Sequence, residues 1–341
     1  MLDWRGSYSA EWRVFRVDGQ TWADADEVSG IDSVSIDLTD SGEMVSGALV
    51  ATGAEFEPGY LRVVMTATQG GAVERVDVAT LLVESTSRRL AQGAWSVTLD
   101  GCSVLHPAAT CRLFSPPYAP AGSDGAALAG ELLGQCIDAP VSVEGSFELG
   151  GDVVFDPGCS ALDAAWLVLQ AGRHTLQVHG DGTVHVVAMP VEVALDLDDA
   201  NAALLMPDVD RTLDLSAVPN RYVAVDGGAA AVAANEDAES PTSRAARGYW
   251  IDVYDDAPTY IGGETLAQYA ARRLVEMSTV RDERTYTREW WPGVHPGDIV
   301  RGSLASAGLD GDMRVSAQSF ECGAGIVVTE NAYGEVRTWE P

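Results

Sequence analysis

Three histidines crowd one short stretch and are the residues that best suggest metal chemistry. His174, His179 and His185 fall on a predicted hairpin, and imidazole is the commonest metal ligand among side chains. His179 and His185 flank the turn, whereas His174 has the opposite strand parity to His179. No cysteine or well-spaced carboxylate completes a tetrahedral set. We therefore expect exposed hairpin histidines, with no metal and no cofactor.

Carboxylates gather at two places where calcium binding or acid–base catalysis could be considered. The two groups are Asp196, Asp198 and Asp199, and Asp208, Asp210 and Asp214. Neither group has the spacing of a known calcium loop. A chain with 51 acidic residues forms such clusters by chance, so we interpret both as solvated faces.

Motifs of the common enzyme classes are absent from the sequence. It has no Gly-x-Ser-x-Gly elbow, no P-loop and no dinucleotide fingerprint. We expect a protein that is not an enzyme, with no catalytic residue. Two other classes stay open. Exposed tryptophans such as Trp290 and Trp291 could stack on sugars in a carbohydrate-binding β-protein, and paired carboxylates could cleave glycans.

The charge balance bears on the kind of partner. The 341 residues carry a net charge of −30, and all 21 basic residues are arginine. Nucleic-acid binding needs a basic surface that displaces counterions from phosphates, so this composition argues against it. It fits a protein that repels DNA or stays soluble at high local concentration.

The spacing of the cysteines and the length of the apolar runs indicate the cellular compartment in which the chain is made. The five cysteines lie far apart without a Cys-x-x-Cys pair, so we interpret them as small buried hydrophobes in a chain made in a reducing compartment. They are Cys102, Cys111, Cys136, Cys159 and Cys322. No apolar run is long enough to span a membrane, and the first residues lack the pattern of a signal peptide.

Residues 1–101 show the alternation and the turns of an antiparallel β-domain. Short strands are predicted at 11–17, 34–38, 60–68, 73–84 and 94–99. Turn residues such as Asp18-Gly19 and Gly70-Gly71 separate them. We expect an antiparallel barrel or sandwich.

Residues 102–190 predict a small α+β domain. Leucine spacing indicates a helix within 123–137. A second helix has Ser160 as its N-cap, Asp163 three residues later and Gly172 just past its end. A hairpin follows, with strands at 176–179 and 184–187 that turn at Gly180-Asp181-Gly182.

Residues 191–341 predict a second β-domain with two insertions. One is a polar loop at 235–247. The other is an amphipathic helix at 264–280, whose apolar face consists of Leu266, Tyr269, Ala270, Leu274 and Met277.

Strand and turn phrases of the first β-domain recur in the second in the same order. Pro58-Gly59 before a strand matches Pro296-Gly297, and the strands that begin at Val83 and Val97 match those at Val315 and Val327. A strand ending in Val-Asp-Gly precedes both copies, at 14–19 and 222–227. Such order indicates a duplicated β-domain, although β-proteins in general reuse these phrases.

This order of elements resembles the tail hub proteins of long-tailed phages and prophages, which are related to the hubs of contractile injection systems. The phrases that carry the resemblance span nearly the whole chain. They are the Val-Asp-Gly strand, the hairpin His179-Gly180-Asp181-Gly182-Thr183-Val184, the strand Pro219-Asn220-Arg221-Tyr222-Val223, the helix Thr265-Leu266-Ala267-Gln268-Tyr269-Ala270 and the closing Pro-Gly-Asp-Ile-Val hairpin.

The resemblance implies a structural virion protein built mainly of β-structure. Two similar antiparallel, tail-tube-like barrels per chain, with the α+β domain between them, would form a homotrimeric pseudo-sixfold ring. The ring would adapt a sixfold tail tube to a threefold tip and line the DNA channel during genome ejection. Expected partners are the tail tube or distal tail protein, the tape measure protein, and tip, fibre or baseplate proteins.

The resemblance also implies a location and a division of labour. The protein would belong to the virion tail, at the baseplate or tail tip, and would be assembled in the host cytoplasm without a membrane anchor or sequence-specific DNA binding. Several members of the family continue into a hydrolase or a receptor-binding fibre. This sequence ends shortly after the second β-copy, so we expect other proteins to carry those activities.

Overall fold

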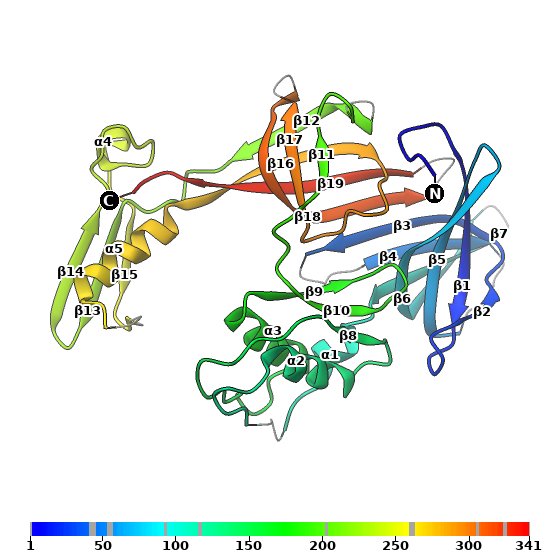
Figure 1. Ribbon diagram of the computed structural model, residues 1–341, viewed down its shortest axis with the longest axis horizontal. Helices are drawn as coiled ribbons and strands as arrows, with labels where there is room; N and C mark the ends of the chain where they lie inside the picture. The colour runs from blue at the N-terminus through cyan, green and yellow to red at the C-terminus, as the bar shows by residue number, and fades with distance from the viewer. Residues whose placement is uncertain are drawn as a thin grey trace. The chain divides into compact units, whose positions relative to one another are not determined.

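The computed structural model describes residues 2–40, 46–52, 57–91, 94–114, 118–201, 204–258, 263–304, 307–322 and 326–340. The fold is mainly β, as the alternating apolar pattern predicts (Figure 1). Contacts divide the chain into two compact units, Met1–Val209 with Thr285–Ala332 and Asp210–Arg284 with Tyr333–Pro341. Helices within the described ranges are all too short or too polar to cross a bilayer.

A 13-stranded sheet runs through the first unit. Its strands follow the order β12-β16-β19-β18-β3-β4-β7-β6-β5-β1-β2, and β17 pairs with both β18 and β11. The strands of the first half are β1 (Ser9–Val17), β2 (Asp24–Glu27), β3 (Ile31–Thr39), β4 (Ser46–Thr52), β5 (Gly59–Gln69), β6 (Ala72–Ala91) and β7 (Ala94–Ser103). Those of the second half are β11 (Val193–Leu197), β12 (Leu205–Leu213), β16 (Thr279–Glu289), β17 (Ile299–Leu304), β18 (Leu309–Cys322) and β19 (Ile326–Arg337).

Burial along the strands shows which faces are covered. In β3 only one face is buried, through Val34 and Ile36, and its neighbours alternate with them in exposure. In β5 the residues from Tyr60 to Met65 are all buried, because its two faces belong to different apolar clusters. Leu61 and Met65 pack into the main core of the sheet, whereas Tyr60 packs against the helical insertion.

The two halves of the sheet repeat one strand order. In the first half β4, β7, β6, β5 and β1 are successive neighbours, and in the second half β16, β19, β18, β17 and β11 are. The repeated phrases at Val83 and Val97 lie in β6 and β7, and those at Val315 and Val327 lie in β18 and β19. The direction of one pairing differs between the halves. Strand β1 is antiparallel to β5, whereas β11 is parallel to β17.

One predicted correspondence is wrong. The Val-Asp-Gly strand of the first half is β1, which pairs with β5, but its supposed counterpart is β13 (Arg221–Asp226). That strand lies in a separate sheet of the second unit and pairs with β14 and β15. Three residues that recur at a strand end specify a turn, and they do not specify which strand will be the neighbour.

The expected pair of closed barrels is not found among the described residues. Instead β3 of the first half pairs antiparallel with β18 of the second, from Val34↔Cys322 to Thr39↔Ala317, and joins the halves into one sheet. A strand at a sheet edge presents unpaired N–H and C=O groups, and pairing two edges satisfies both rows. Each half therefore avoids one open edge without closing on itself.

The insertion between the halves packs directly on the first half of the sheet (Figure 1). Its elements are α1 (His106–Thr110), α2 (Gly125–Gly134), β8 (Val141–Val143), α3 (Ala161–Ala171), β9 (His174–Val178) and β10 (Val184–Ala188). As predicted, the Ser160 hydroxyl accepts a hydrogen bond from the Asp163 N–H and Gly172 ends α3. Its main apolar cluster includes Tyr60 and Leu82 of the sheet, so the insertion shares a core with it.

The second unit contains a three-stranded sheet in the order β14-β13-β15 and two helices. The remaining bounds are β14 (Ala229–Ala234), α4 (Arg244–Arg247), β15 (Asp252–Asp255) and α5 (Leu266–Met277). Helix α5 begins with a capping box between Thr265 and Gln268, and buries Leu274 against Tyr222 of β13. The predicted polar loop at 235–247 includes α4.

The three-part division into residues 1–101, 102–190 and 191–341 stays a prediction. The boundaries between the two compact units fall within strands β12, β16 and β19. The two units therefore do not correspond to the three predicted domains.

Candidate functional site

The β9–β10 hairpin brings two of the three predicted histidines together. His179 and His185 stack with ring centroids 3.8 Å apart and planes 22° apart. His295, from the segment before β17, stacks on His179 at 5.0 Å and 9°. His174 lies elsewhere, buried against Phe147. The expectation of exposed hairpin histidines is wrong, because His179 and His185 are half-buried and His174 is buried.

Acidic side chains hold the outer rings of the histidine stack. His185 Nδ1 lies 2.8 Å from Glu144 Oε1, and His295 Nδ1 lies 3.6 Å from Asp298 Oδ2. Burial, and secondarily the charges that His295 and His185 can carry, lower the pKa of His179 to about 4. His179 is therefore neutral at physiological pH, and the stack joins the hairpin to the second half.

Sequence reasoning did not identify His295 as a partner of the hairpin. The residue lies directly before the repeated Pro296-Gly297 turn, which the sequence analysis did single out. Nothing in the local pattern indicates that this turn faces β9 and β10. Gln177 confirms the contact, because its Nε2 donates to Asp298 Oδ1 at 3.2 Å.

The turn of the same hairpin is bound to the first half of the sheet. Trp22 Nε1 and Arg62 Nη2 both donate to the Asp181 carbonyl oxygen, at 2.8 and 2.7 Å. Thr80 Oγ1 donates to the Gly180 carbonyl oxygen at 2.9 Å. The hairpin therefore contacts both halves of the sheet, through its turn on one side and through the histidine stack on the other.

The two turn glycines are required by this close approach. A Cβ atom on Gly180 would lie 1.8 Å from the Asp77 carbonyl oxygen, a backbone atom that cannot rotate away. Gly182 has φ +81°, and a Cβ there would lie 2.8 Å from Thr80 Cβ. The Gly-Asp-Gly turn thus fits against β6 only without side chains at its first and last positions.

The two groups of aspartates lie at the surface. Five of the six are exposed, and Asp198 is half-buried. Asp198 Oδ1 accepts hydrogen bonds from the N–H groups of Ala200 and Asn201, as in an ordinary turn. In the part of the chain that the structure describes, none of the six belongs to a group of three ligands close enough to hold one ion.

The tryptophans proposed as sugar platforms are covered. Trp290 is only 5% exposed and packs edge-to-face on Trp4, with ring centroids 5.7 Å apart. Trp291 is half-buried beneath the Arg5 guanidinium, which lies 5.8 Å from its ring centroid. The carbohydrate-binding alternative needs an exposed Trp290, but this side chain, just after β16, is buried in the main core.

The cysteine interpretation is also wrong in part. Cys111 and Cys136 form a disulfide, with Cα atoms 6.2 Å apart, where the ends of α1 and α2 meet. Cys102, Cys159 and Cys322 are free and half-buried rather than fully buried. The pairing escaped sequence reasoning because the two cysteines are separated by 25 residues and meet only through helix packing.

Comparison with solved structures identifies the fold. The tail protein from Neisseria meningitidis MC58 superposes with a TM-score of 0.64 at 17% identity, covering 96% of this chain and 97% of that chain. The 43 kDa tail protein of prophage MuSo2 from Shewanella oneidensis gives 0.63 at 15%, covering 97% of both chains. This chain has the fold of phage tail proteins. The resemblance inferred from the sequence is confirmed at this level.

A third solved structure shows the same fold over part of a longer chain. A chain of the Francisella PdpA–VgrG complex superposes with a TM-score of 0.57 at 7% identity, covering 98% of this chain and 59% of that chain. No protein-family model and no curated protein sequence matches the chain.

Proposed function

We propose that this protein is a structural hub subunit of a phage or prophage tail. It forms a homotrimeric ring that adapts a sixfold tail tube to a threefold tip and lines the channel through which DNA passes. The function is geometric and needs no catalytic residue or cofactor. The fold shared with tail proteins along nearly the whole chain supports this proposal.

The repeated strand order is the observation that carries the proposal. The β4-β7-β6-β5-β1 and β16-β19-β18-β17-β11 arrangements place the same strand order twice in one chain, apart from the parallel pairing of β11 with β17. Three such chains around a threefold axis offer six similar surfaces, which is what docking on a sixfold tube requires. We propose that residues 1–101 and 191–341 act as the two tube-like domains of each subunit.

The inserted parts lie outside this repeat and suit contacts with neighbouring tail proteins. These parts are the insertion at 102–190, the loop at 235–247 and the helix at 264–280. Partners are the tail tube or distal tail protein, the tape measure protein, and tip, fibre or baseplate proteins. The location is the virion tail, after assembly in the host cytoplasm.

The charge of the chain suits a channel for DNA. A net charge of −30 repels phosphates, so DNA can slide past without being retained. The carbohydrate-binding alternative loses its main support, because Trp290 is buried.

The oligomeric state tests the proposal directly. Native mass spectrometry and light scattering across concentration, with electron microscopy of any oligomer, should show a trimeric ring with six similar lobes around a channel. The measurement is repeated with the adjacent tail tube protein, because hub interfaces are often completed only during assembly. A chain that stays monomeric under both conditions contradicts the ring.

A further inference from the structure

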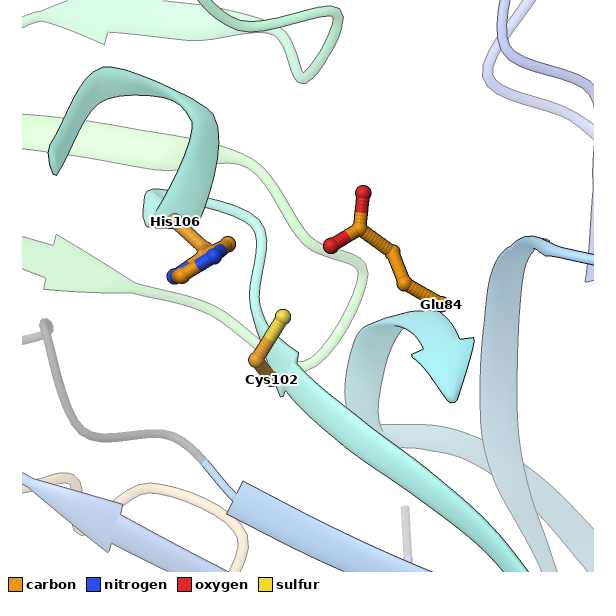
Figure 2. Close-up of side chains that lie close together, drawn as sticks. All are labelled: Glu84, Cys102 and His106. Carbon is orange, nitrogen blue, oxygen red and sulfur yellow. The ribbon is translucent and has the colours of Figure 1, made fainter. Parts of the chain in front are cut away.

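Three side chains with metal-binding atoms converge where the chain leaves the sheet to enter the insertion. Figure 2 shows Glu84 from β6, Cys102 near the end of β7 and His106 at the start of α1 pointing toward one another. One ligand atom from each lies within 4.8 Å of the other two. In the described part of the chain this is the only group of three such residues with that spacing.

The backbone directs Glu84 to this place. Along β6 and β7 the pairing shifts between Val83 and Ser85, so Glu84 is the extra residue of a β-bulge. Cys102 pairs with Leu82, two residues before Glu84. A bulge re-aims one side chain relative to a regular strand, and here it points the carboxylate toward the Cys102 thiol.

A short buried turn places His106. Only three residues separate it from Cys102, and all three, Ser103, Val104 and Leu105, are completely buried. Ser103 Oγ accepts a hydrogen bond from the Leu105 N–H at 3.1 Å. The positions of all three ligands are therefore set by sheet pairing and core packing, even though Glu84 and His106 themselves are exposed.

We propose that Glu84, Cys102 and His106 bind a divalent cation of the zinc class. Thiolate and imidazole are the ligands that zinc and its neighbours in the first transition row prefer, and a carboxylate completes a three-ligand set with one open position for water. A thiolate and a carboxylate together neutralise the two positive charges of the ion. Magnesium and calcium, which prefer oxygen ligands, are excluded by the thiol and the imidazole.

Binding needs only small side-chain movements. A tetrahedral zinc site spaces its ligand atoms about 3.3 to 3.8 Å apart. The exposed Glu84 and His106 side chains can rotate to that spacing without disturbing the core. Cys102 Sγ now lies 3.3 Å from the Leu82 carbonyl oxygen, to which the thiol donates. On binding, the S–H bond breaks, the sulfur–metal bond forms and the proton passes to solvent.

The bound ion would fix α1 to the bulge of β6. It would thereby tie the first helix of the insertion to the sheet, independently of the contacts that the β9–β10 hairpin makes. This site does not depend on the proposed hub function, since it lies entirely within one chain.

Cobalt(II) is the appropriate probe, because thiolate ligation produces an intense near-ultraviolet charge-transfer band and tetrahedral geometry produces visible bands. The full-length chain, without a polyhistidine tag, is stripped with a chelator and titrated with cobalt and then zinc. We expect both bands to saturate at one equivalent per chain and to vanish when zinc displaces cobalt. No charge-transfer band at one equivalent, or retention of cobalt in excess zinc, overturns the proposal.

Variants assign the ligands. C102S should abolish the charge-transfer band, and H106A and E84Q should each weaken binding at least tenfold. The control is C159S, which removes another half-buried free cysteine and should leave the titration unchanged. His106 is exposed, so H106A should keep the fold and the thermal melting of the metal-free native chain. A full band in C102S, or equal affinity in H106A and the native chain, contradicts the assignment.

Discussion

Arg288 on β16 and Glu330 on β19 form an ion pair in which both side chains are completely buried. Arg288 Nε donates to Glu330 Oε2 at 2.9 Å. Gln318 Nε2 donates to Glu330 Oε1 at 2.6 Å, so both carboxylate oxygens are hydrogen-bonded. The second half of the sheet therefore contains a buried charge network in place of an apolar core at this point.

Removing one member of this pair should be strongly destabilising. E330A leaves the Arg288 guanidinium buried without its counter-ion, and we expect the free energy of unfolding to fall by about 3 to 5 kcal/mol. The double variant R288M/E330L removes both charges and should recover most of that loss. Urea unfolding followed by circular dichroism measures both. A loss below about 1 kcal/mol for E330A would show that water reaches the site.

Substitution of the hairpin turn should weaken the attachment of the insertion. G180A places a methyl group against the Asp77 carbonyl oxygen, and we expect a loss of about 1 to 3 kcal/mol as the turn moves away from β6. The matched control is G151A, where no atom lies within 4 Å of the new Cβ, and its effect should stay within about 0.5 kcal/mol. Equal unfolding midpoints for the two variants would contradict the close contact.

The histidine stack should make stability depend on pH. The pKa of His179 is about 4 in the folded chain and about 6.5 when unfolded, so the unfolded state binds a proton first as the pH falls. Stability is therefore complete above pH 6.5 and is lost progressively down to pH 4. The stack also faces Glu144, Asp181 and Asp298, whose negative charges oppose the effect without cancelling it.

Melting temperatures from pH 8 to pH 4 test this expectation. The native chain should lose stability between pH 6.5 and 4, and H179Q, which cannot be protonated, should lose less over the same interval. With every chain stripped of metal by a chelator, H106A serves as the control, because this exposed histidine lies outside the stack. If H179Q and the native chain give parallel profiles, the loss comes from other groups.

Truncating a buried side chain in the core of the second unit should lower the free energy of unfolding. Leu274 of α5 is completely buried against Tyr222 and Tyr269, so L274A should cost about 2 to 5 kcal/mol. V232A, on β14, is the control because Val232 is 60% exposed, and its effect should be small. Hydrogen exchange should quicken in α5 and β13 of L274A. Unchanged exchange in both elements would contradict the proposed core.

Local features followed from the sequence because short-range physics determines them. The Ser160 cap of α3 and the turn at Gly180-Asp181-Gly182 depend on residues within one helical turn or one hairpin. The amphipathic face of α5 and the strands of the first half depend only on apolar periodicity. The predicted elements lie within a few residues of their expected ends, except that β6 runs on to Ala91; strands β2 and β4 were not predicted.

The candidate sites depended on contacts that no local pattern encodes. His295 stacks on His179, and Trp290 turns inward onto Trp4, because distant strands pass close to one another. The Cys111–Cys136 bond likewise needs the packing of two helices. Each pairing was missed for the same reason, since sequence distance carries almost no information about spatial distance once a chain folds back on itself.

By itself the sequence determined a mainly β, acidic chain with recurring strand and turn phrases, because composition and periodicity act residue by residue. Only the tertiary structure decided how the two copies are joined. Strand edges have no sequence signature for their partner, and the pairing of β3 with β18 is selected by the satisfaction of backbone hydrogen bonds over the whole sheet. That long-range choice replaced two expected barrels with one continuous sheet.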